Sequence, residues 1–121
     1  MIDDNPIDRF LVEKVAVKTS FAKEVLSFDG AGPGLEYLKT RLGNDQEYPS
    51  LILLDINMPE IDGFGFLELY RELAPAAPVA AKIVMLTSSM DSSDYERAMS
   101  YPYVSGFLNK PLTPDKLQEL R

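Results

Sequence analysis

Apolar residues occur along the chain in short unbroken runs and in stripes at helical spacing. The clearest run covers residues 51–54, where four aliphatic side chains follow one another without alternation. Such a run is typical of a parallel strand that helices cover on both faces. Together these patterns predict five strands, at residues 1–2, 22–29, 51–54, 82–87 and 103–109.

The stripes at helical spacing predict a helix after each strand. Asn5 followed by Pro6 has the composition of a helix N-terminus. Apolar residues then recur at every fourth position to about residue 20. Ser93 with Glu96 three residues later is a capping-box pattern, which we expect to open the fourth helix. The remaining helices are predicted at residues 35–42, 64–73 and from 113 onward.

Strands and helices therefore alternate along the whole chain. This order predicts an α/β fold with a parallel sheet, right-handed crossovers and helices on both faces. A length of 121 residues is close to the commonest size of one domain. We therefore predict a single domain over residues 1–121.

Composition narrows the classes of function. The chain has 12 basic and 19 acidic residues, a formal net charge of −7, which argues against direct binding of nucleic acid. It has no Cys and no His, so disulfides, thiolate chemistry and the commonest general base are excluded. No apolar run is long enough to span a bilayer and no secretory signal opens the sequence, so we expect a cytoplasmic protein with no membrane contact.

Five polar residues follow the predicted strands. Asp3 and Asp4, Asp55, Thr87 and Lys110 each lie at the carboxyl end of a strand, and in a parallel sheet those ends share one edge. Two unit charges about 4 Å apart repel by about 4 kcal/mol at an effective dielectric of about 20, so neighbouring carboxylates need a cation. Lys110 supplies one charge, and a hard divalent ion such as Mg²⁺ would supply more. A metal, an ammonium and a hydroxyl around a carboxylate are what phosphoryl transfer requires.

With these motifs in place, the chain resembles the receiver domain of two-component response regulators over nearly its whole length. The resemblance rests on the Asp3-Asp4 pair and on the segments at residues 53–63, 86–88 and 107–111. It implies a flavodoxin-like (βα)₅ three-layer sandwich with a parallel five-stranded sheet in the order 2-1-3-4-5. It also implies that the protein takes a phosphoryl group from a histidine kinase or a histidine phosphotransfer protein.

The resemblance also implies roles for single residues. Asp55 looks like the phosphoacceptor, and Asp55 and Asp4 look like direct Mg²⁺ ligands. The backbone carbonyl of Asn57 resembles the third protein ligand, and Asp3 would act through water or a hydrogen bond to Lys110. Each position also has a simpler interpretation, because acids often begin turns and are favoured at helix N-termini.

A switch is implied as well. Lys110 resembles the ammonium that pairs with the phosphate, and the bond to Pro111 resembles the family's cis peptide. Thr87 looks like the hydroxyl that turns toward the phosphate, and Phe107 like the aromatic whose rotamer follows it. The face formed by the fourth helix, the last strand and the fifth helix would then change its affinity for a downstream protein or effector domain, or for a second copy of the chain.

The sequence departs from the family at its first strand. Several aliphatic residues should precede the acid pair, but only Met1 and Ile2 do. We therefore expect the sequence to begin part-way into this strand, and the last helix, which stops at Arg121, to be shortened too.

Two other functions remain open. A haloacid-dehalogenase-type phosphatase also uses an Asp nucleophile after a parallel strand, but there an acid normally stands where this chain has Asn57. A pseudo-receiver would bind partners without phosphorylation, although all five site positions are filled. In the preferred interpretation the protein is a stoichiometric phosphoacceptor and not an enzyme, since it catalyses at most its own phosphorylation and dephosphorylation.

Overall fold

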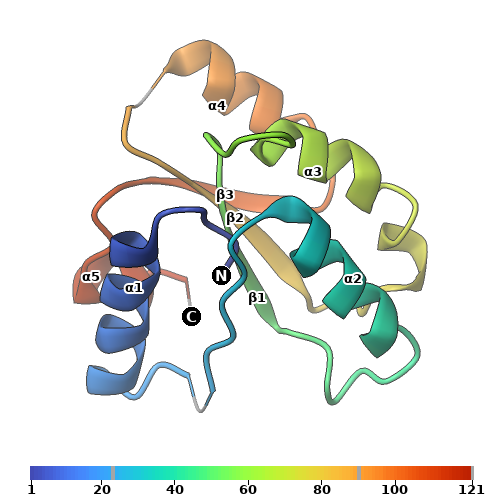
Figure 1. Cartoon of the computed structure of the whole chain (residues 1–121), viewed down its shortest axis with the longest axis horizontal. Coiled ribbons are helices and arrows are strands. Elements are labelled where there is room, and N and C mark those ends of the chain that lie inside the picture. Colours follow the sequence, from blue (N-terminus) through green and yellow to red (C-terminus); the bar gives the residue numbers. More distant parts are fainter. Residues whose placement is uncertain (23, 90, 121) are drawn as a thin grey trace.

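A parallel sheet lies between two helical layers in the computed structural model, which describes residues 1–22, 24–89 and 91–120 (Figure 1). Its regular part contains three strands, β1 (Leu51–Asp55), β2 (Lys82–Thr87) and β3 (Val104–Asn109), in the order β1-β2-β3. The pairs are parallel, with Asp55 opposite Leu86 and Thr87 opposite Asn109. The carboxyl ends of all three strands therefore meet at one edge, as the sequence predicts.

The sheet continues beyond β1 through two single bridges. Ile2 is paired in parallel with Leu54 on one side and with Phe28 on the other. The spatial order Phe28, Ile2, β1, β2, β3 is the predicted order 2-1-3-4-5.

The segment predicted as a strand at residues 22–29 does not form a regular one. Of its described residues only Phe28 is bridged, and Lys23 lies outside the described residues. Phe28 exchanges backbone hydrogen bonds with Met1 and Asp3, at 2.8 and 3.0 Å. Beside this bridge, the amino group of Met1 donates a hydrogen bond to the Leu26 carbonyl at 2.7 Å.

The helices are α1 (Pro6–Lys18), α2 (Ala31–Arg41), α3 (Gly63–Tyr70), α4 (Ser92–Met99) and α5 (Pro114–Gln118), with a short 3₁₀ helix η1 (Ala74–Ala76). Helices α1 and α5 cover one face of the sheet, and α2, α3 and α4 cover the other (Figure 1). The predicted starts of α1 and α5 are confirmed, and the side chains of Asn5 and Thr113 cap them by accepting hydrogen bonds from first-turn amides. Among the described residues, no helix combines the length and apolar character that a bilayer crossing needs.

Two predicted helix starts are wrong. The cap of α4 is Asp91 and not Ser93, since the Asp91 carboxylate accepts from the amides of Ser93 and Asp94. A carboxylate there also gains from the helix dipole, which a hydroxyl does not. Helix α2 begins at Ala31, earlier than the predicted start at residue 35. Pro33 is tolerated because it lies in the first turn, where amides have no partner within the helix.

The apolar run of β1 divides its side chains between two cores. Ile52 and Leu54 pack with residues of α2 and α3, whereas Leu53 packs with Val12 of α1 and Leu117 of α5. Burial on both faces explains why this strand shows no alternation of polar and apolar residues. Its last residue is Asp55, which brings a buried carboxylate to the carboxyl edge of the sheet.

Candidate functional site

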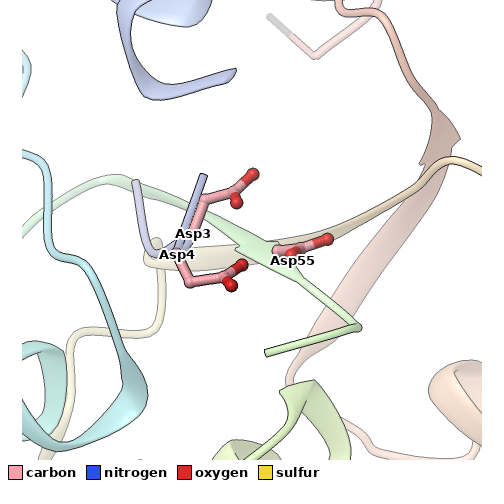
Figure 2. A group of neighbouring side chains, drawn as sticks. All are labelled: Asp3, Asp4 and Asp55. Atoms are coloured by element: carbon pink, nitrogen blue, oxygen red, sulfur yellow. The ribbon is translucent and has the colours of Figure 1, made fainter. Parts of the chain in front are cut away.

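Three carboxylates gather at this edge of the sheet. Asp55 ends β1, and Asp3 and Asp4 follow the Ile2 bridge beside it. One oxygen from each lies within 4.8 Å of the others, and their side chains project to the same side of the strand ends (Figure 2). Asp3 is fully buried and Asp55 is 5% exposed, whereas Asp4 is exposed to solvent. The sequence prediction that distant acids meet here is therefore confirmed in position.

Lys110 places its ammonium among these acids. It follows β3, and its amide donates a hydrogen bond to the Thr87 carbonyl at 2.7 Å. Its Nζ lies 2.8 Å from Asp3 Oδ2 and 3.1 Å from Asp55 Oδ1. The peptide bond from Lys110 to Pro111 is cis, as predicted. The ammonium therefore connects the carboxylate at the end of β1 with the one that follows Ile2.

Lys110 also contacts a third carboxylate, that of Asp8, which the sequence analysis does not predict as part of the site. Asp8 Oδ2 accepts a hydrogen bond from Lys110 Nζ at 2.8 Å. Asp8 lies in the first turn of α1, where an acid is already favoured by the helix dipole, so its residue type alone gave no reason to single it out. The available signal was positional, because a helix that starts directly after Asp4 holds its first turn over the same edge of the sheet.

Burial and charge shift the acidity of the site. The pKa of Asp55 is raised to about 6, because burial and the negative charge of Asp3 together outweigh the opposing effect of Lys110. Burial alone would lower the pKa of Lys110, but its hydrogen bonds to Asp3 and Asp8 outweigh burial and raise that pKa above its ordinary value. Lys110 is therefore a permanent cation, and Asp55 is largely ionised at neutral pH.

The residues at this edge fit a divalent cation. Carboxylate oxygens are the ligands that Mg²⁺ prefers, and Asp3, Asp4 and Asp55 offer three of them within 4.8 Å. Exposure of Asp4 leaves access for an ion that keeps part of its water shell. Three carboxylates, those of Asp3, Asp8 and Asp55, contact one ammonium, and Asp4 lies beside two of them, so the charge balance also favours a further cation.

The remaining predicted residues lie around this cluster. Thr87 ends β2 next to Asp55 and is buried, and its hydroxyl donates to the Ser89 carbonyl at 2.9 Å and accepts from the Ser89 amide at 3.1 Å. Phe107 of β3 is buried, and its ring meets Tyr95 of α4 edge to face at 5.6 Å. Asn57 is exposed in the loop after β1.

One known protein family matches nearly the whole chain. The family model of the response regulator receiver domain matches residues 1–120. The chain belongs to this family. The predicted resemblance and fold class are thereby confirmed, and the dehalogenase-type phosphatase is set aside.

Relatives of this receiver domain come from distant organisms. The two-component response regulator ORR1 of rice (Oryza sativa subsp. japonica) is 26% identical over all of this chain, and the chain spans 52% of that protein. The probable methanogenesis regulatory protein FilR2 of Methanothrix harundinacea is 28% identical over 98% of this chain and 74% of its own length. The chain thus corresponds to about half of the rice regulator.

Solved structures agree with the sequence relatives. A two-component response regulator from Cytophaga hutchinsonii superposes with a TM-score of 0.89 at 29% identity, covering 98% of this chain and 89% of that one. A response regulator receiver protein from Dyadobacter fermentans gives a TM-score of 0.80 at 32% identity, covering 98% and 90%. The arrangement of strand ends described above is therefore that of a receiver domain.

Proposed function

We propose that this receiver domain accepts a phosphoryl group on Asp55 from the phosphohistidine of a histidine kinase or a phosphotransfer protein. One observation supports the proposal above the others. Asp55 ends a buried strand with its carboxylate 3.1 Å from the Lys110 ammonium and beside two further acids that fit Mg²⁺. An Asp that only ended a strand would not be expected to lie beside an ammonium and two further acids.

In the transfer, one carboxylate oxygen of Asp55 attacks phosphorus, the bond from phosphorus to the donor nitrogen breaks, and its electron pair returns to the imidazole. Lys110 pairs with a phosphoryl oxygen and offsets its charge. Asp4, Asp55 and the Asn57 carbonyl would hold Mg²⁺ directly and Asp3 through water. When bound, Mg²⁺ supplies the positive charge that three carboxylates and a phosphoryl group together require. The domain acts on itself once for each phosphoryl group, so it is a phosphoacceptor and not an enzyme for a separate substrate.

The same proposal includes a switch. A phosphoryl group offers the Thr87 hydroxyl new acceptors, so Thr87 leaves Ser89 and Phe107 shifts into the space that it vacates. The surface of α4, β3 and α5 then changes its affinity for a downstream protein, an effector domain or a second copy of the chain. Moving such an equilibrium from 1:99 to 99:1 needs about 5.5 kcal/mol of differential stabilisation. Residues 1–121 act as a single receiver unit in the cytoplasm.

Intact mass after exposure to phosphoramidate, with and without Mg²⁺, tests the proposal. The parent chain is expected to gain one phosphoryl group only with Mg²⁺, and Asp55→Ala is expected to gain none. Asp45→Ala is the matched control, because it removes an exposed loop carboxylate and should leave the gain unchanged. A parent that is folded by circular dichroism and never gains the group would overturn the proposal in favour of phosphorylation-independent binding.

A further inference from the structure

We infer that Asp8 is a positioning residue, which holds the Lys110 ammonium back from the phosphoacceptor and so limits how tightly a phosphoryl group is bound. The inference rests on the proposed function of Asp55. It concerns a residue of α1 that no part of the sequence pattern assigns to the site.

The contacts of the ammonium support this role. Lys110 Nζ makes hydrogen bonds to Asp3 Oδ2 and Asp8 Oδ2, both at 2.8 Å, and lies 3.1 Å from Asp55 Oδ1. An ammonium has three N–H donors, so two of them point at acids other than the phosphoacceptor. The shortest contacts of Lys110 are thus to the two acids that would compete with a phosphoryl oxygen for its ammonium.

The two competing acids differ in their surroundings. Asp3 is fully buried, and its other oxygen accepts from the Asn5 amide at 2.9 Å, so Asp3 is held in place. The Asp8 side chain is 30% exposed, so its carboxylate can exchange the ammonium for water at lower cost. When a phosphoryl oxygen competes for Lys110, the hydrogen bond to Asp8 is the one that gives way.

A purely structural role would predict a different outcome. As a first-turn acid, Asp8 stabilises α1 through the helix dipole, and any acid at the third helical position would do the same. Asp94 stands at the corresponding position of α4, and it forms no ion pair with any of the residues that the structure describes. Asp94→Asn therefore removes the favourable interaction of a first-turn acid with the helix dipole, as Asp8→Asn does, but leaves the surroundings of Lys110 unchanged.

The experiment compares the parent with Asp8→Asn, Asp8→Glu and Asp94→Asn in saturating Mg²⁺. The dissociation constant for beryllofluoride, a phosphoryl mimic, is measured by titration of backbone amide signals in NMR spectra. Asp8→Asn should bind beryllofluoride about threefold to tenfold more tightly, because a neutral amide oxygen accepts from Lys110 more weakly than a carboxylate does and one nearby negative charge is lost from a partly exposed pair. Asp8→Glu should return the constant to within about twofold of the parent, and Asp94→Asn should leave it unchanged.

A second measurement reads Lys110 directly and needs no phosphoryl group. In protein labelled with ¹⁵N-lysine, the Nζ signal of Lys110 should move and its proton exchange should speed up in Asp8→Asn, with no change in Asp94→Asn. If that signal moves while beryllofluoride binds as in the parent, the contact is structural and the inference is wrong. If the parent binds no beryllofluoride although Lys110 responds to Asp8→Asn, the proposed function fails and takes the inference with it.

Discussion

The two halves of the sheet hold their parts of the site in different ways. Strands β1, β2 and β3 are paired along five or six residues each and carry Asp55, Thr87 and Lys110 at or just beyond their ends. Ile2, which precedes Asp3 and Asp4, joins the same sheet through single bridges. Regular pairing therefore sets where Asp55 lies, whereas Asp3 depends on a few backbone bonds and on its contact with Lys110.

Because of this difference, we expect the ion pair between Asp3 and Lys110 to contribute to the stability of the fold. The ion pair between Asp3 and Lys110 joins residues 107 positions apart and ties the sparsely paired half to the regular half. We therefore expect this ion pair to stabilise the fold around the candidate site. The substitutions below separate these two contributions.

The largest effect is expected from Lys110→Met. It leaves Asp3, fully buried, and Asp55, 5% exposed, without their ammonium, so the free energy of unfolding should fall by about 3–5 kcal/mol. Urea denaturation at neutral pH without metal measures it, with the exposed Lys82→Met as control. Mg²⁺ should restore part of the loss. Parent-like stability of Lys110→Met in the absence of metal would show that the two halves do not depend on this ion pair.

The second largest effect is expected from Mg²⁺ binding, which depends on the exposed Asp4 of the sparsely paired half. Mg²⁺ at one hundred times its dissociation constant should raise the free energy of unfolding by about 2.7 kcal/mol if it binds only the folded chain. Asp4→Asn should abolish most of this gain, because Asp4 is the exposed acid of the cluster. Thermal unfolding with and without Mg²⁺ measures it, and Asp45→Asn should keep the full gain.

A smaller effect is expected from Gly63→Ala in the regular half. A Cβ on Gly63 would lie 2.6 Å from the Asp55 carbonyl oxygen and 2.9 Å from Ile56 Cα. Both are backbone atoms of the strand end, so the cost should be about 1–3 kcal/mol, with a displaced Asp55. Urea denaturation measures the cost, and loss of phosphoramidate labelling would report the displacement.

The same substitution in the sparsely paired half should have the smallest effect. A Cβ on Gly34 would meet Ile2 Cδ1 at 2.7 Å, which is the end of a flexible side chain. Ile2 and Gly34 both line a cavity of about 480 Å³, so Ile2 has room to shift. Alanine within helix α2 also gains about 0.5–1 kcal/mol over glycine, so Gly34→Ala should stay within about 1 kcal/mol of the parent. Equal losses for Gly34→Ala and Gly63→Ala would contradict the contrast between the halves.

Sequence reasoning succeeded where one local rule decided the outcome. An unbroken aliphatic run identified β1 and hence Asp55 at its end, and Asn5 with Pro6 identified the start of α1. The meeting of Asp3, Asp55 and Lys110 followed from one rule of topology, that parallel strands end at the same edge.

It failed where two local preferences competed or where a contact spans the whole chain. Asp91 and Ser93 are both good cap residues, and only the folded backbone shows that the Asp91 carboxylate reaches the first-turn amides. The segment before Phe28 has the composition of a strand, but its pairing with the chain near Ile2 joins residues far apart in the sequence, which composition does not encode. Asp8 was missed because its contact with Lys110 joins residues 102 positions apart.

In the proposed switch, the two hydrogen bonds between Thr87 and Ser89 would make the site selective among anions. The hydroxyl and the Ser89 backbone satisfy each other within their own loop, so nothing in the resting arrangement draws Thr87 outward. An ion that merely neutralises Lys110 gives the hydroxyl no better acceptor, and we expect it to leave the loop as it is. In the proposed switch, only a group held covalently on Asp55, with an oxygen turned toward β2, would replace both broken hydrogen bonds. Under the proposed function, the loop would therefore respond to phosphorylation of Asp55 and not to the binding of free phosphate.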